Sequence, residues 1–592
     1  MNKKQIMCFV VAAMMLLAFL PGCGSDGGNL SPQHEAITMQ SPFRNMSAFI
    51  DIVHEKYPEI NIEVEPYSGQ NFTAYVKGQL KSGDMPDIYC TTYYFPERED
   101  LSDRLINLAG YAFTDNYAPA RLKEVTANGE IYLLPTYYEC FGITYNKTLL
   151  DKNGWTLPTS MKELEELAPK VKAAGYNLCL DQYQLPGYGF QYLCNILDTD
   201  FLNTIEGRKW QKAFLAGEAT LRGTPQMMES MKTLERWRDI GMLNGNASLE
   251  SDNETHLKMA EGNTLFMLGS NNVFTKEETT DEFGLMPYLS DDGTKNSFVL
   301  NVSRYIGLNK HLEDKGNEQK LEDALHIMEV LSTVEGMQAL NSTYTNTSLL
   351  PLKDYKVNSE GYYARIEDDL NEGATAPFIY DGWENILVKI GETMISFIRG
   401  EATIDAVIAS FDDNRDLVND NSDDAYTTVA EKIDTNHCAK LVGIIYAKAS
   451  GADMALISKN KWYKLDKNED LNFDGVSGAL FPLPVTDQEI VSILPAGWRG
   501  TIETVTLRGA RIKEIAQNGY DREGNGVVFP YELVTPDGFE IDDNKTYTVA
   551  VAGITEEVEK EGNLTDSGVM GLEAARNYLK QFDKLTENDI VW

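Results

Sequence analysis

The sequence offers few residues that could break and make bonds. Its six histidines are scattered, and none lies in a "GNHE", "GHxH" or "HExxH" motif, where histidines hold a catalytic metal. No "GxSxG" nucleophile motif and no Walker phosphate loop occurs either. The stretch "GEIYLLPTYYECFGITYNK" (129–147) instead gathers tyrosines around one acid, Glu139, without a histidine or a cysteine pair. We therefore expect no catalytic residue, and this stretch needs another explanation.

A second stretch has the spacing of metal ligands. In "DLNFDG" (470–475), Asp470, Asn472 and Asp474 alternate and a glycine follows, as in the first half of a calcium loop. The twelfth position is Phe481 instead of a bidentate glutamate, which excludes an EF-hand. The segment is thus a weak calcium candidate, the alternative being a polar turn. No cofactor is expected.

Composition and charge exclude several classes of protein. The 592 residues carry a net charge of −38, which argues against nucleic-acid binding because phosphate contacts need a basic face. Hydrophobic residues make up 43% and aromatic residues 10%, values typical of globular proteins and not of disordered ones. The length predicts two to four folding units.

The N-terminus has the pattern of an export signal. Lys3 and Lys4 precede the apolar run "IMCFVVAAMMLLAFL", and "LPGC" ends at Cys23. This "LPGC" resembles the lipobox of bacterial lipoproteins, which implies a lipoprotein signal peptide over residues 1–23 whose Cys23 is acylated and becomes the new N-terminus, and anchoring at the outer face of the cytoplasmic membrane. An ordinary cleaved signal peptide is the alternative. Residues 24–35 then form a flexible tether.

The remaining cysteines give little information. Besides Cys8 and Cys23 there are five, an odd number without a disulfide framework. A single pair between Cys179 and Cys194 stays open.

The order of expected elements is that of an α/β protein. Short β-rich runs alternate with helical periodicity from Ala36 onward. The patterns predict strands over 36–40, 60–67 and 87–95, and helices over 46–58, 72–83, 158–175, 226–242, 324–340 and 384–400. The segment 411–426 is dense in Asp and Asn and reads as a linker. A second module with strand–helix–strand order follows over 425–592, beginning with a helix over 429–451.

Residues 36–420 resemble the extracellular solute-binding proteins of ABC importers, in the carbohydrate-binding group that includes maltose-binding protein. The resemblance rests on motifs in the family's order: "FIDIVHEKYPEINIEVE", "GQLKSGDMPDIY", "ITYNKTLLDKNGW", "LPTSMKELEELAPKVKAAG", "MAEGNTLFMLGSNNV" and "SRYIGLNK". It implies a periplasmic-binding-protein-like fold of two α/β lobes with a ligand cleft between them. Sugars need aromatic platforms and polar groups there.

The resemblance also implies which residues contact ligand. At the family's contact positions this sequence has Phe43, Arg44, Tyr93, Tyr94, Tyr138, Glu139, Asp181, Tyr183, Tyr188, Asn271, Asn272 and Trp383, with Tyr137 facing the same cleft. The Asn pair stands where the family usually has a tryptophan, which leaves the particular sugar open. For each tyrosine, packing in the protein is the alternative to ligand contact.

The second module is similar to the C-terminal domain of secreted 5′-nucleotidases. "GADMALIS", "VTDQEIVSILP", "IETVTLRGARIKEIAQNG" and "IDDNKTYTVAVAG" carry this similarity, which implies a smaller, separate α/β (α+β) domain. The glycine-rich "NGGGIR" loop and the "PFGN" segment of those enzymes are replaced by "SKNKWY" and "PAGW", so their binding residues do not carry over. Trp462 and Trp498 are possible platforms, with core packing as the alternative.

These observations lead to one expected function and two rivals. We expect a lipid-anchored, non-enzymatic binding protein that captures a carbohydrate and delivers it to an ABC permease. A nucleotidase-like hydrolase and a nucleoside-binding or sensing surface receptor are the alternatives.

Overall fold

The computed structural model of the chain describes most of its residues. They are residues 34–41, 43, 46–67, 69–92, 101–182, 186–245, 248–249, 252–268, 274, 278–341, 348–357, 366–371, 374–377, 383–415, 425–459, 475–519, 528–553 and 562–592. Cys23, most of the expected tether and the calcium candidates Asp470, Asn472 and Asp474 lie outside them. Within the described ranges, no helix is long and apolar enough to cross a membrane.

Lobe 1, built by the described residues within 34–141 and 298–377, contains a seven-stranded sheet in the order β11-β4-β10-β3-β1-β2, with β12 paired to β10. β1 runs parallel to β2 and β3, whereas β10 is antiparallel to β3 and β4. Its strands are β1 (Ile37–Ser41), β2 (Ile62–Pro66), β3 (Ile88–Thr91), β4 (Leu134–Phe141), β10 (Phe298–Leu308), β11 (Ser348–Leu349) and β12 (Thr375–Pro377). Its α-helices are α2 (Ser47–Lys56), α3 (Phe72–Ser82), α4 (Pro119–Glu124), α11 (Glu318–Leu331), α12 (Val334–Leu340) and α13 (Glu367–Asn371).

Local sequence explains the first helices of lobe 1. Phe49, Ile50 and Val53 are spaced so that one face of α2 is apolar, and all three are buried. In α3, the Asn71 side chain accepts a hydrogen bond from the backbone amide of Ala74. Gly83 ends the same helix in the left-handed conformation.

Lobe 2, built by the described residues within 142–297 together with residues 383–415, contains a five-stranded sheet in the order β7-β6-β8-β5-β9. The strands are β5 (Ile143–Asn146), β6 (Asn177–Gln182), β7 (Ser248–Leu249), β8 (Thr264–Met267) and β9 (Phe283–Met286). The helices are α5 (Lys147–Asn153), α6 (Met161–Ala173), α7 (Pro186–Leu197), α8 (Ile205–Leu215), α9 (Pro225–Ile240), α10 (Asp252–Ala260), α14 (Glu384–Ile398) and α15 (Ile404–Asn414), with a π-helical turn, η3, over Asp198–Leu202.

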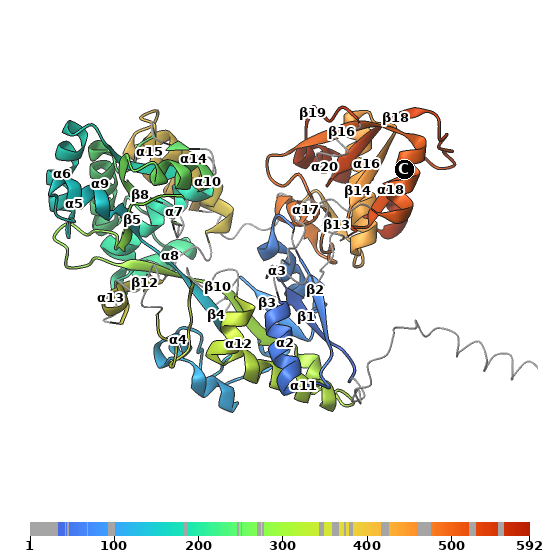
Figure 1. The fold of residues 1–592 in the computed structure, drawn as a ribbon, viewed down its shortest axis with the longest axis horizontal. Helices are drawn as coiled ribbons and strands as arrows, with labels where there is room; N and C mark the ends of the chain where they lie inside the picture. The colour runs from blue at the N-terminus through green and yellow to red at the C-terminus, as the bar shows by residue number, and fades with distance from the viewer. Residues whose placement is uncertain are drawn as a thin grey trace, which may run out of the picture.

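Two long strands connect the lobes (Figure 1). β4 pairs with β10 over most of its length, from Phe141 opposite Val299 to Leu134 opposite Ile306. The chain leaves β4 at Gly142 and enters β5 of lobe 2 at once. A Cβ atom at Gly142 would lie 2.6 Å from the carbonyl oxygen of Met286, so only glycine fits at this crossing.

The C-terminal unit, residues 425–592, has two sheets, ordered β15-β13-β20 and β17-β14-β18-β16-β19. Its strands are β13 (Thr427–Val429), β14 (Met454–Ser458), β15 (Pro484–Val485), β16 (Thr501–Arg508), β17 (Tyr531–Val534), β18 (Thr546–Ala552), β19 (Thr565–Met570) and β20 (Lys584–Leu585). Its α-helices are α16 (Thr435–Ser450), α17 (Asp487–Ile493), α18 (Gly509–Asn518) and α20 (Gly571–Leu579). Figure 1 shows this unit, orange to red, above α3 of lobe 1.

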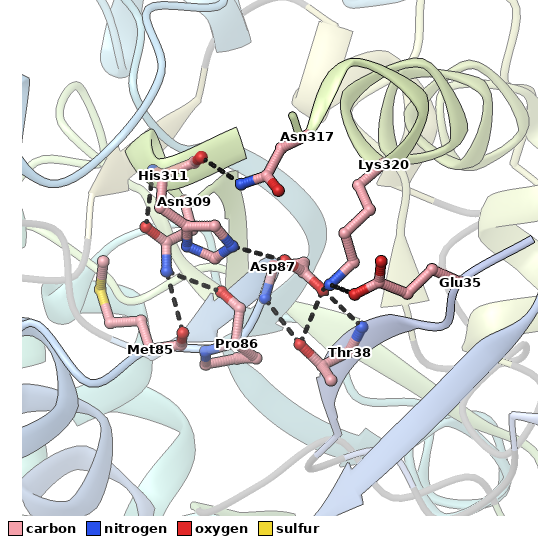
Figure 2. A network of polar contacts seen from close by, with 9 residues as sticks. All are labelled: Glu35, Thr38, Met85, Pro86, Asp87, Asn309, His311, Asn317 and Lys320. Carbon is pink, nitrogen blue, oxygen red and sulfur yellow. Dashed lines mark hydrogen bonds and ion pairs between the residues drawn. The ribbon is translucent and has the colours of Figure 1, made fainter. Parts of the chain in front are cut away.

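A buried aspartate explains the "MPD" motif of lobe 1 (Figure 2). The Asp87 carboxylate accepts hydrogen bonds from the backbone amide and hydroxyl of Thr38, at 2.8 and 2.9 Å. It also lies 2.7 Å from His311 Nε2 and 3.2 Å from Lys320 Nζ. One carboxylate, directly before β3, thereby joins β1, the short helix that follows β10 (Lys310–Glu313) and α11.

Several expected elements are corrected. The helix expected over 324–340 is interrupted at Ser332, and Thr333 caps a new helix, α12. Residues 429–433 are not helical, since β13 ends at Val429 and α16 begins at Thr435. The expected linker begins inside α15, where Phe411 is in the core of lobe 2. The other expected strands and helices are present, with the third strand shortened to Ile88–Thr91.

The five cysteines beyond residue 33 are all buried free thiols, so Cys179 and Cys194 form no disulfide.

Candidate functional site

Polar and aromatic side chains gather where the crossing strands meet the first turn of α3. We call this group the crossing cluster; it consists of Phe72, Thr73, Thr92, Glu139, Asn301 and Arg304, all half-buried. Glu139 and Asn301 are directly opposite each other on β4 and β10. The Arg304 guanidinium lies 5.4 Å from the centre of the Phe72 ring. The hydroxyls of Thr73 and Thr92 are 2.7 Å apart.

An irregularity in β10 directs Arg304. The register between β10 and β4 shifts on both sides of this residue, as in a β-bulge. Its Nη1 donates to the Ser303 carbonyl at 2.6 Å. The Ser303 hydroxyl in turn donates to the Tyr137 hydroxyl at 2.6 Å. The bulge therefore holds a guanidinium at the junction of the lobes.

Charge within the crossing cluster is partly balanced. Burial raises the pKa of Glu139, while Arg304 and a hydrogen bond from Asn301 act in the opposite direction. A desolvated carboxyl group beside a guanidinium and an amide is well suited to hydrogen-bond hydroxyl groups. Together with the Phe72 ring, the cluster can bind a polyhydroxylated solute.

The structure corrects the prediction for Phe43, Tyr137 and Tyr138. Phe43 is 3% exposed and packs in the lobe 1 core. Tyr137 and Tyr138 are 3% and 2% exposed, on opposite faces of β4. The Tyr138 hydroxyl donates to Glu124 at 2.6 Å, and the Arg121 guanidinium lies 4.8 Å from its ring centre. These side chains pack within lobe 1 because β4 is a central strand, covered on both faces.

Three predicted residues lie in lobe 2, outside the crossing cluster. Trp383 is 1% exposed in an aromatic cluster, with its ring centre 5.2 Å from that of Phe214, so it is a core residue and the prediction is corrected. Asp181, at the end of β6, is buried and accepts a hydrogen bond from the backbone amide of Asn244 at 3.0 Å. Tyr188 is half-buried on α7 against the lobe 2 core.

Of the predicted residues that the structure describes, only Glu139 belongs to the crossing cluster. Six others lie outside the described residues, namely Arg44, Tyr93, Tyr94, Tyr183, Asn271 and Asn272. Sequence reasoning missed Phe72, Thr73, Thr92, Asn301 and Arg304. A signal for Arg304 was available, since a guanidinium interrupts the apolar run of "NVSRYIGL".

No candidate metal centre emerges from the described part of the chain, where no three His, Cys, Asp or Glu side chains could share an ion. Burial also raises the pKa of the Cys90, Cys140, Cys179, Cys194 and Cys438 thiols, so none is an activated nucleophile.

The fold has solved relatives. A family 1 extracellular solute-binding protein from Bifidobacterium longum subsp. infantis matches with a TM-score of 0.53 and 16% identity, covering 65% of this chain and 99% of that one. A sugar transporter from Bacillus licheniformis in complex with stachyose matches at a TM-score of 0.50 and 17% identity, over 65% and 100% of the two chains. RafE in complex with raffinose matches with a TM-score of 0.51 and 15% identity, covering 64% of this chain and 100% of that one. About two thirds of the chain therefore has the α/β periplasmic-binding-protein fold, to which the C-terminal sheets are added.

The sequence comparisons agree with the fold. A curated relative, the melibiose/raffinose/stachyose-binding protein MelE of Bacillus subtilis, is 23% identical over 214 residues, which are 32% of this chain and 48% of that protein. The match thus spans about half the length of this relative. Residues 40–325 match the family model for bacterial extracellular solute-binding proteins. This part of the chain is therefore similar to extracellular solute-binding proteins.

Proposed function

We propose that this protein captures a carbohydrate between its two lobes and delivers it to an ABC-type permease. The observation that carries the proposal is the crossing cluster, which places a ring, a guanidinium, a carboxyl group and hydroxyls where both crossing strands leave lobe 1. Sugars present flat apolar faces and many hydroxyls, and these groups match both features.

The relatives support an oligosaccharide as the ligand class. Two of the similar structures hold stachyose and raffinose, and the curated relative is named for melibiose, raffinose and stachyose. Residues 36–420 would form the solute-binding domain. Arg44, Tyr93, Tyr94, Tyr183, Asn271 and Asn272 remain proposed ligand contacts, as do Asp181 and Tyr188 on lobe 2.

Capture would proceed by closure of the lobes about β4 and β10. A solute that contacts both lobes stabilises the closed state, since it binds that state better than the open one. The permease would recognise the closed pair of lobes, and no bond is broken.

The proposal includes the two ends of the chain. Cys23 would carry the lipid that holds the protein at the outer face of the membrane, and Cys23→Ala should release it into the culture medium. Residues 425–592 would be an accessory, non-catalytic module similar to the C-terminal domain of 5′-nucleotidases.

The proposal is tested with the purified protein lacking residues 1–23. Thermal-shift and calorimetric titrations would use melibiose, raffinose, stachyose, maltose, monosaccharides and nucleosides. Arg304→Ala should weaken binding of the best sugar about tenfold or more, because it removes a charged hydrogen-bonding group. Arg238→Ala is a matched control, since its guanidinium lies 4.3 Å from the centre of the Phe397 ring in lobe 2.

Absence of binding to every sugar would refute the carbohydrate assignment. Binding of a nucleoside alone would favour the sensing alternative, and equal affinity of Arg304→Ala and the unchanged protein would refute the crossing cluster as the site.

A further inference from the structure

The C-terminal unit shares a hydrophobic core with lobe 1. Tyr67, Tyr75 and Val76 of lobe 1 belong to one buried cluster with Ala479 and Phe481 of the C-terminal unit. The ring centres of Tyr75 and Phe481 are 5.6 Å apart. This contact is a buried core, and not a loose surface contact between two modules.

A glycine within α3 is explained by this contact with the C-terminal unit. Gly78 is buried in the middle of the helix, where glycine costs about 1 kcal/mol relative to alanine. A Cβ atom there would lie 2.5 Å from Cδ2 of Phe481. Gly78 therefore admits the Phe481 ring against the helix, and the sequence of lobe 1 is adapted to the C-terminal unit.

Polar contacts join the same surfaces. The Tyr67 hydroxyl donates to the carbonyl of Ser492, at the end of α17, at 2.7 Å in a buried position. Lys432 Nζ lies 2.6 Å from the Asp84 carboxylate. Hydrogen bonds of this kind fix orientation, so the two parts have a defined relative position.

One of these contacts reaches the solute site. Asn71 Nδ2 donates to Gln488 of α17, at 2.6 Å to Oε1 and 3.3 Å to the carbonyl oxygen. Asn71 Oδ1 accepts from the amide of Ala74 at 3.2 Å and so caps α3. The next two residues, Phe72 and Thr73, belong to the crossing cluster. A residue of the C-terminal unit thus orients the cap on which the edge of the site is built.

We infer that the C-terminal unit is a fixed part of lobe 1 and positions the first turn of α3 for solute binding, with Gln488 as the positioning residue. The part that concerns affinity rests on the proposed carbohydrate function. On closure, lobe 2 moves against lobe 1 and the C-terminal unit together.

The test uses two variants that break the contact in different ways. Gln488→Ala removes the side-chain acceptor. Asn71→Ser keeps a good capping residue, but its shorter side chain does not reach Gln488. Gln488→Glu retains an oxygen acceptor and should restore the contact. Lys513→Ala, on α18 of the same unit, is the control, since its ion pair is with Asp543 within that unit.

The first readout, hydrogen exchange of the Ala74 amide, needs no ligand. The Ala74 amide should exchange about two- to fivefold faster in Gln488→Ala and in Asn71→Ser. This is the lower part of the range for one hydrogen bond, because Gln488 is exposed. The second readout is the Kd for raffinose, which should rise by a similar factor, with Gln488→Glu and Lys513→Ala unchanged.

Unchanged exchange in both variants would overturn the inference. If the unaltered protein binds raffinose, faster exchange of the Ala74 amide with an unchanged Kd for raffinose would also overturn the inference. If the unaltered protein binds no sugar, the proposed function fails, and the exchange rates still decide whether the C-terminal unit positions α3.

Discussion

Replacing Asp87 by Asn should destabilise lobe 1 strongly. The Asp87 carboxylate is 2% exposed and contacts four donors, on Thr38 (two), His311 and Lys320. An amide of the same shape cannot accept from all of them, and it leaves Lys320 without its closest anion. Removing one partner of a buried ion pair costs about 3–5 kcal/mol, and Lys320 is only 17% exposed. We expect a loss of about 2–4 kcal/mol.

The direction of the Asp87 pKa shift determines how the stability of lobe 1 depends on pH. Burial alone would raise the pKa of Asp87, but the hydrogen bonds from Thr38 and the ion pair with Lys320 lower it below its ordinary value. A carboxyl group with a lowered pKa in the folded state contributes stability above its unfolded pKa, about 3.9, and this stability is lost as pH falls through the folded pKa. In Asp87→Asn, this acid-dependent part of the unfolding free energy should vanish.

Hydrogen exchange of the amides in β1 and β3 measures the unfolding free energy of lobe 1 directly, without requiring the whole chain to unfold in one step. Glu55→Gln, an exposed carboxylate on α2, is the control. A change below about 0.5 kcal/mol in Asp87→Asn, the range of ordinary surface substitutions, would refute the reasoning.

Two further predictions concern the other parts of the chain. Phe481→Ala should lower the unfolding free energy of the C-terminal unit and of α3 by about 3–5 kcal/mol because it leaves a cavity. The control Phe539→Ala should cost little, since Phe539 is 39% exposed. Equal hydrogen-exchange protection of the α3 amides in the two variants would contradict a shared core. Burial raises the pKa of Asp198 to about 7, against an opposing effect of Arg208, so its contribution to stability is full below its unfolded pKa and is lost as pH rises toward 7. Asp198→Asn should remove this loss of stability, which amounts to up to about 4 kcal/mol between pH 4 and pH 7. Tryptophan-monitored urea unfolding of lobe 2 at several pH values measures the change. The same pH profile in the variant and the unaltered protein would contradict the prediction.

Much of the secondary structure could be predicted because its signals are local. α2 follows from apolar spacing, and α6 follows from the Ser160 cap and the Glu163 carboxylate, which accepts from the Thr159 amide and hydroxyl. The single helix expected over 324–340 was wrong because its apolar stripe continues through Thr333, although this residue caps α12. Hydrophobic periodicity alone does not reveal such a break.

The candidate site was harder to predict. The tyrosines beside Glu139 lie on a strand bordered by β10 and β11, and each is buried on one face of it. Two adjacent tyrosines followed by an acid cannot show whether both faces of a strand are covered, because the covering residues are distant in sequence. The sequence singled out Glu139 as a candidate, whereas Arg304 and Phe72 meet only in the folded protein.

The amino-acid sequence was sufficient for the α/β class, for most helices and strands, and for the similarity of residues 40–325 to solute-binding proteins, since caps, periodicity and short motifs are properties of neighbouring residues. The folded structure alone decided that Trp383 is a core residue, that the crossing cluster forms between α3, β4 and β10, and that Phe481 packs against Gly78. These three facts depend on contacts between residues far apart in the chain, and such contacts are set by the packing of whole elements.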